Sequence, residues 1–378
     1  MKYILWTLRI IIGVLFIFSG VVKANDPLGL TYKMDEFFEV WNMNFMTHYT
    51  LALSVMMIGF EIISGVAMLV GNTFRTYITL LLLLNLFYTF LTGYVLYSGK
   101  IKECGCFGDC IPLSNSVTFY KDVALSVMAI ILYVYRKQVH PVVKNYSFNF
   151  TVGTLAVIFA FGIQWYTLKH LPVHDCLAYR VGNNLWEKMQ PEAGATPPVF
   201  QTTFVYEKNG QKKDFTEKDY PWQDSTWKFV SSESKLIKEG TGQPKIPHDF
   251  ALTDSDGTDQ TQAILTAKGY VFLWFMRSPD KAPNTNMDRL RNLATKAQTL
   301  HIPFYMLSSA GYDLILPYRK QWNVMDVPVM TLDYTISKTA IRTNPGLMLL
   351  KDGVVMGKWS YADYPRDMVL DNGNLEFR

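Results

Sequence analysis

The sequence lacks most of the residue patterns that mark the common enzyme classes. It has no glycine-rich loop that would hold a phosphate, no arrangement of serine, histidine and aspartate suited to hydrolysis, and no paired-carboxylate motif. The net charge is only +4, and no basic stripe or low-complexity arm occurs, so we expect no nucleic-acid partner. Charged residues make up 18% of the 378 positions, and cysteine occurs only four times.

Long apolar runs are abundant, and they crowd into the first 168 positions. A bilayer core of about 30 Å needs roughly 20 apolar helical residues. The first run is not expected to be a cleaved signal peptide, because Arg9 interrupts it and Lys23 occupies the would-be cleavage site. The sequence therefore predicts a membrane protein with five spans and a soluble C-terminal part. The spans are expected at about 3–22, 49–71, 74–97, 117–135 and 150–168.

Positive charges in the short loops indicate how the spans are oriented. Arg136, Lys137 and Lys144 lie between the fourth and fifth spans, and Arg75 lies between the second and third. Such loops are retained on the cytoplasmic side. We therefore expect a bacterial inner-membrane protein with a cytoplasmic N-terminus and a periplasmic C-terminal part.

The cysteines are clustered in the sequence. Cys104, Cys106 and Cys110 lie within seven residues on the loop between the third and fourth spans, and Cys176 follows the fifth span by about eight residues. All four thiols can therefore lie at one membrane face. Four cysteines allow three disulfide pairings, and the sequence does not choose among them. The periplasm is oxidising, so thiols there can form disulfides and exchange them.

Two ionisable residues interrupt the apolar spans, Arg9 in the first and Glu61 in the second. Charged groups inside hydrocarbon are costly. Arg9 can extend to the inner headgroups and Glu61 can be protonated against a neighbouring helix, which would make both structural. Alternatively, they pair with each other or with a polar ligand such as a quinone headgroup. The sequence requires no cofactor, and a quinone is the one candidate.

The membrane half carries motifs that resemble a known family. In the first two spans these are Leu8-Arg9-Ile10, Gly13, Phe18-Ser19-Gly20-Val21-Val22-Lys23, Gly59-Phe60-Glu61 and Gly65. The cysteine turn Cys104–Gly108 is followed by Lys121-Asp122 at the head of the fourth span. Over roughly residues 1–136 the chain resembles the DoxX and MauE membrane proteins, and the cysteine turn resembles MauE in particular. The resemblance implies a four-helix bundle and a role in periplasmic thiol or disulfide handling.

The remaining chain divides into three parts. Residues 137–168 are expected to form a cytoplasmic loop and the fifth span, and residues 169–243 a linker with a small β-rich segment, where Asn209-Gly210 predicts a hairpin turn. Residues 244–378 are expected to form an α/β domain. Its predicted strand 270–276, helix 286–300 and strand 303–308 imply a parallel unit with a right-handed crossover. Residues 344–359 predict a hairpin that turns at Asp352-Gly353.

The order of predicted strands and helix in residues 244–378 resembles the thioredoxin-like fold of the peroxiredoxin and TlpA type. Pro345 stands in the place of the family's cis-proline. Where the family has Cys-x-x-Cys, this chain has Met276–Lys281 and no cysteine. The stretch Asp333–Arg342 is a further departure. Thioredoxin chemistry needs a thiolate at the missing position. We therefore expect a binding module that contacts a periplasmic or envelope protein partner.

Three functions stay open at this point. The first is a membrane thiol–disulfide oxidoreductase in which Cys104 and Cys106 supply a strained bond, Cys110 resolves it, and Cys176 acts as an outer relay. Its electrons would pass to a quinone held near the buried arginine and glutamate. The second is a non-enzymatic envelope scaffold with two inert disulfides. The third is a four-thiolate metal site, which the spacing of Cys106 and Cys110 fits and the Cys-x-Cys pair does not. The family resemblance favours the first.

Overall fold

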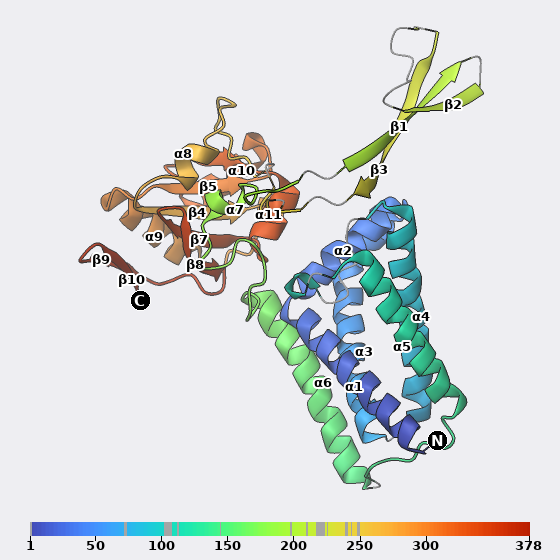
Figure 1. The fold of residues 1–378 in the computed structure, drawn as a ribbon. Helices are drawn as coiled ribbons and strands as arrows, with labels where there is room; N and C mark the ends of the chain where they lie inside the picture. Colours follow the sequence, from blue (N-terminus) through green and yellow to red (C-terminus); the bar gives the residue numbers. More distant parts are fainter. Residues whose placement is uncertain are drawn as a thin grey trace. The chain divides into compact units, whose positions relative to one another are not determined.

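A computed structural model describes most of the chain (Figure 1). The described residues are 2–71, 74–101, 108–111, 113–143, 145–196, 199–208, 211–216, 224, 226–238, 241–242, 244–247 and 250–378. The chain divides into two compact units, of which one comprises Met1–Trp186 with Asp249–Arg378 and the other Glu187–His248. The membrane helices and the thioredoxin-like sheet both belong to the first unit.

Long apolar helices form the membrane region. Among the described residues, five helices are long and apolar enough to cross a bilayer. At most 44% of the most apolar window of any of them is buried inside the structure. Most of their apolar side chains therefore face outward, as contact with lipid tails requires. The predicted spans are confirmed as α1 (Lys2–Asn25), α3 (Thr50–Val70), α4 (Phe74–Ser98), α5 (Asn115–Val134) and α6 (Tyr146–Lys169).

Small residues let α1 and α3 approach closely. A Cβ atom added at Gly65 would lie 2.7 Å from the carbonyl oxygen of Gly13, and one added at Gly13 would lie 3.1 Å from the carbonyl oxygen of Gly65. Helices in a bilayer gain little from apolar contact alone, so close backbone packing of this kind drives their association. The contact aligns α1 and α3 so that Lys23 and Glu61 meet farther along the same helix pair.

We expect Gly65→Ala to lower the free energy of unfolding of the detergent-solubilised protein by about 1–3 kcal/mol, as overpacking does elsewhere. The added methyl group meets backbone atoms, which cannot rotate away. Gly153→Ala in α6 is the matched control, since a Cβ at that position meets nothing within 4 Å. Thermal unfolding of both variants measures the effect. Equal melting temperatures for the two would contradict the close contact.

The segment between α1 and α3 forms the helix α2 (Pro27–Val40) and the 3₁₀ turn η1 (Asn44–His48). Asp26 caps α2, because its carboxylate accepts a hydrogen bond from the Gly29 amide at 3.0 Å. Pro27 occupies the first helical position, where a missing amide costs nothing. This segment lies at the end of the bundle where α1 ends and α3 begins (Figure 1). We call that end the cysteine face, because Cys110 follows α4 there and Cys176 follows α6.

The second unit contains a three-stranded antiparallel sheet in the order β2-β1-β3. Its strands are β1 (Val199–Lys208), β2 (Gln211–Thr216) and β3 (Lys228–Lys238). Lys208 pairs with Gln211, so only two residues connect β1 to β2. Those residues are the predicted Asn209-Gly210 turn, which lies outside the described residues.

The C-terminal domain has a five-stranded mixed sheet in the order β6-β5-β4-β7-β8. Strands β4, β5 and β6 are parallel, and β7 runs antiparallel to β4 and to β8. The side chains of β4 are buried almost throughout, which is expected of a central strand. The strands are β4 (Tyr270–Met276), β5 (Phe304–Ser308), β6 (Val329–Thr331), β7 (Gly346–Lys351) and β8 (Val354–Ser360). A small hairpin, β9 (Met368–Asp371) and β10 (Asn374–Phe377), follows.

The predicted thioredoxin-like arrangement is confirmed. Helix α9 (Met287–Thr299) connects β4 to β5, the Asn344–Pro345 peptide bond is cis, and β7 turns into β8 at Asp352-Gly353. The sequence analysis did not identify α10 (Tyr312–Trp322) or β6, because Pro317 interrupts the helical pattern and the strand is only three residues long. The extra stretch before Asn344 forms α11 (Tyr334–Ala340). Two shorter helices are α7 (Leu185–Lys188) and α8 (Thr261–Leu265), and two 3₁₀ turns are η2 (Gly108–Cys110) and η3 (Pro279–Lys281).

Candidate functional site

A disulfide joins two of the four predicted cysteines. Cys110 in η2 bonds to Cys176 in the loop after α6, with Cα atoms 4.8 Å apart and a sequence separation of 66. Both cysteines are half-buried. Cys104 and Cys106 lie outside the described residues. The Cys110–Cys176 bond excludes the two pairings in which Cys110 or Cys176 is joined to Cys104 or Cys106.

The residues next to Cys176 hold its loop from two sides. The His174 amide donates to the side-chain oxygen of Asn25 at 2.9 Å, and the Asn25 side chain donates back to the His174 carbonyl at 2.8 Å. On the other side, the Asp175 carboxylate accepts a hydrogen bond from the Lys358 ammonium at 2.5 Å. Cys176 is thereby fixed between the end of α1 and strand β8. Burial lowers the pKa of Lys358, and the neighbouring Asp175 carboxylate acts in the opposite direction.

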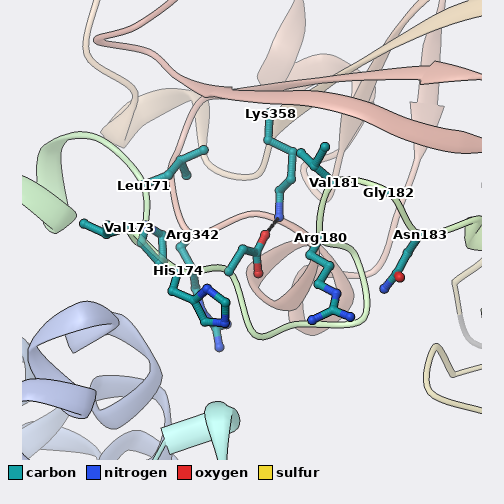
Figure 2. A pocket seen from close by; sticks show the side chains of 11 residues that line it. Leu171, Val173, His174, Arg180, Val181, Gly182, Asn183, Arg342 and Lys358 are labelled. Atoms are coloured by element: carbon teal, nitrogen blue, oxygen red, sulfur yellow. Dashed lines mark hydrogen bonds and ion pairs between the residues drawn. The ribbon is translucent and has the colours of Figure 1, made fainter.

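A cavity of about 590 Å³ opens beside this loop. Figure 2 shows the Lys358 side chain extending to its ion pair with Asp175, and His174 and Arg180 among the other side chains that line the cavity. The cavity has three cationic lining residues, Arg180, Arg342 and Lys358, and one anionic residue, Asp175. Its other lining residues are Leu171, Pro172, Val173, His174, Val181, Gly182 and Asn183.

A second polar centre lies inside the bundle, around Glu61. The Lys23 ammonium lies 2.6 Å from Glu61 Oε1, and Ser19 donates to Oε2 at 3.0 Å. The Tyr88 hydroxyl also donates to Oε1, and its ring lies 4.7 Å from the Lys23 ammonium. The Glu61 side chain is 0% exposed and that of Lys23 is 4% exposed. We call Ser19, Lys23, Glu61 and Tyr88 the Lys23 cluster.

The Lys23 cluster borders a narrow apolar cavity of about 40 Å³. Lys23 and Tyr88 are among its lining residues, and most of the others are aliphatic and aromatic side chains of α2, α3 and α4. The lining thus combines Lys23, Lys33 and Tyr88 with mainly apolar side chains. The aromatic lining residues are Phe37, Phe38, Trp41, Phe87 and Tyr88.

The structure does not bring Arg9 and Glu61 together. The Arg9 guanidinium donates to the carbonyl oxygens of Leu69 at 2.7 Å and His140 at 3.0 Å, and also to that of Met68. Met68 and Leu69 lie in the last turn of α3, where helix carbonyls lack helical partners, and His140 lies in the loop between α5 and α6. Arg9 therefore stabilises a helix end, whereas Glu61 belongs to the Lys23 cluster.

Comparisons with known proteins agree with the membrane architecture. Residues 1–135 match the family model described as methylamine utilisation protein MauE. The membrane region is MauE-like. Protein TlpB of Flavobacterium psychrophilum is 32% identical over 142 residues, which cover 35% of this chain. This chain covers 36% of the length of that protein. Residues 200–239, within the second unit, match a domain of unknown function, DUF8463.

The family match agrees with a MauE-like membrane region. The strand order gives the thioredoxin-like domain that follows it, and the sequence of that domain has no Cys-x-x-Cys. The likenesses to MauE and to TlpB support a membrane-associated, thiol-related role in general terms. At the missing motif, the Arg277 amide donates to the Asn344 side chain at 2.9 Å, and the buried Arg277 guanidinium donates to the Ile341 carbonyl at 3.1 Å. The segment at that position has no cysteine, and hydrogen bonds to Asn344 and Ile341 hold Arg277 there.

The thioredoxin-like domain contacts α2 of the MauE-like region close to this position. Arg342 Nε lies 2.8 Å from the Asp26 carboxylate. The Tyr32 ring lies 5.3 Å from the Arg342 guanidinium and 4.6 Å from the Lys338 ammonium. Burial raises the pKa of Tyr32 and lowers that of Lys338. The sequence analysis missed these residues because nothing local marks a contact between positions some 300 residues apart.

Proposed function

We propose that this protein is a thiol–disulfide relay in a bacterial inner membrane, with Cys104, Cys106, Cys110 and Cys176 as its exchanging sulfurs. The observation that carries the proposal is the Cys110–Cys176 disulfide, half-buried and held beside a cavity large enough for a peptide segment. The MauE-like region supports a thiol-related role. The basic loops at the opposite end of the bundle favour a periplasmic cysteine face.

The relay begins when a client thiolate attacks Cys176 Sγ. The bond between Cys176 and Cys110 breaks, and Cys110 leaves as a thiolate. A second client thiol attacks the mixed disulfide, which forms the client disulfide and releases Cys176. Two electrons and two protons have then moved from the client to Cys110 and Cys176. A disulfide between Cys104 and Cys106 can accept them in a second exchange of the same kind.

We propose a quinone as the final oxidant class, which takes two electrons and two protons and leaves as a quinol. The Lys23 ammonium is the donor that would bind its carbonyl oxygen, and Glu61 can hold a proton beside it. The cavity volume is about 40 Å³, so a ring enters only if lining side chains such as those of Met34 and Phe38 rotate. Arg9 is not part of this site, because α3 carbonyls occupy its guanidinium.

A non-enzymatic scaffold is the second candidate. The Cys110–Cys176 disulfide also ties the α4–α5 loop to the linker that leads to the thioredoxin-like domain, as a structural clamp would. That domain, which has no catalytic dithiol, fits the binding of an envelope protein partner in either case. In a scaffold the disulfide would be inert toward client thiols.

Trapping of mixed disulfides distinguishes the thiol–disulfide relay from the non-enzymatic scaffold. In Cys110→Ser, Cys176 is a free thiol, and its thiolate can attack the disulfide of an oxidised client, from which one client sulfur leaves as a thiolate. We expect these adducts to accumulate, because the Cys110 thiol that would displace the client from Cys176 is missing. Gel shifts of intact cells, with and without reductant, measure the adducts, and a membrane-impermeant maleimide reports the face on which Cys176 lies. The variant Cys110→Ser with Cys176→Ser is the control. If both variants show the same adducts, or none, the relay is rejected.

A further inference from the structure

The cavity beside Cys176 has an uneven charge distribution. Asp175 pairs with Lys358, and Asp26, which lies outside the cavity lining, pairs with Arg342. The remaining cation of the lining is Arg180, for which the described part of the chain provides no ion pair. Its side chain is exposed, and Figure 2 draws it among the residues that line the cavity. The cavity therefore presents one uncompensated positive charge four residues from the reactive sulfur.

Exchange at Cys176 would develop negative charge in the same loop, four residues before Arg180. The attacking client sulfur is a thiolate, and Cys110 leaves as a second thiolate. A fixed guanidinium nearby attracts anions and increases the rate of their encounter. Arginine also binds a carboxylate with two parallel hydrogen bonds, which fixes the position of the bound group. The ion pair of Asp175 with Lys358 and the hydrogen bond from the His174 amide to Asn25 hold the loop that carries Cys176 beside the cavity.

We propose that the cavity beside Cys176 is a client-binding site selective for cysteine peptides that carry an acidic residue close to the cysteine, with Arg180 as the group that reads the carboxylate. The inference rests on the proposed relay and names its substrate class. Arg180 acts on binding and not on the bond-breaking step, so it determines specificity and is not a catalytic residue.

The test uses the oxidised full-length protein in detergent and three short peptides that differ at one position. That position, two residues after the cysteine, is Glu, Gln or Lys. Loss of the Cys110–Cys176 disulfide is followed by alkylation and mass measurement at low salt. Each rate is divided by the rate of the same peptide with a small soluble disulfide, which removes differences in thiol reactivity. We expect the Glu peptide to react about fivefold faster than the Gln peptide and the Lys peptide to be the slowest.

Variants of Arg180 test whether its guanidinium causes the preference for the Glu peptide. Arg180→Gln is expected to remove the preference, and Arg180→Glu to reverse it in favour of the Lys peptide. Arg291→Gln is the matched control, because Arg291 is an exposed arginine of α9 that lines a different cavity. Equal normalised rates in the wild type, or an unchanged preference in Arg180→Gln, would overturn the inference and leave the relay intact. If no peptide reduces the disulfide, the relay fails and the inference with it.

Discussion

Replacing Cys110 and Cys176 together by serine is expected to abolish oxidation of a reduced client peptide while the bundle stays folded. Without this pair, the relay has no disulfide beside the cavity for a client thiolate to attack. The measurement is the rate of client-disulfide formation per folded protein, with folding checked by gel filtration. A Lys296→Gln variant, which alters a part-exposed ion pair far along the chain in α9, should keep the wild-type rate.

The effect of the same double variant on stability is expected to be smaller. A chain-entropy estimate for a loop of this length gives about 4 kcal/mol. That estimate assumes a flexible unfolded chain, whereas α4, α5 and α6 remain inserted helices and already restrict the loop ends. We expect a loss of about 1–2 kcal/mol, within the range observed for disulfides. A larger stability loss in a protein whose wild type shows no client oxidation would support the scaffold and reject the relay.

How much of this arrangement the sequence predicts depends on the range of the interactions. The five spans follow from local hydropathy, and β4 follows from one apolar run with turns on either side. The cis peptide bond before Pro345 and the turn at Asp352-Gly353 follow from motifs of two residues. These features are set by neighbours in the chain, so a single sequence is sufficient to predict them.

Contacts between distant residues were not predictable in the same way. Lys23 entered the sequence analysis as a residue that prevents signal cleavage, yet the structure places it against Glu61. Arg9 satisfied the pattern of a ligand-binding group, yet its guanidinium donates to backbone carbonyls of the last turn of α3 and to that of His140. The disulfide pairing needs the relative positions of two loops that follow different spans. Each of these outcomes depends on helix packing. The glycine pattern of α1 and α3 indicates that the two helices lie close together, but it does not determine which side chains meet.

The second large effect is expected at the Lys23 cluster. Glu61→Leu leaves the Lys23 ammonium buried without its carboxylate, because both side chains are almost fully enclosed. Breaking a buried ion pair from one side costs about 3–5 kcal/mol, whereas replacing both partners by apolar residues is often neutral. We therefore expect Glu61→Leu to be strongly destabilised and Lys23→Met with Glu61→Leu to recover most of the loss. Unfolding in mixed detergent micelles measures both.

Asn85→Leu in α4 is the matched control, since the Asn85 side chain is buried and donates to Ser126 at 2.8 Å but carries no charge. Its expected cost is about 1 kcal/mol, that of an ordinary hydrogen bond. If Glu61→Leu costs no more than Asn85→Leu, the ion pair is not a major stabilising interaction.

The recovered double variant also separates stability from function. It should fold and accept electrons from client peptides, because its cysteines are unchanged. It should fail to be reoxidised by a soluble quinone, because Lys23 no longer donates to a carbonyl oxygen and Glu61 no longer holds a proton beside it. Reoxidation is followed as the return of the Cys110–Cys176 disulfide after quinone addition. Reoxidation at the wild-type rate would show that the quinone does not bind at the Lys23 cluster. The proposed disulfide exchange at the cysteine face would not be contradicted by that result.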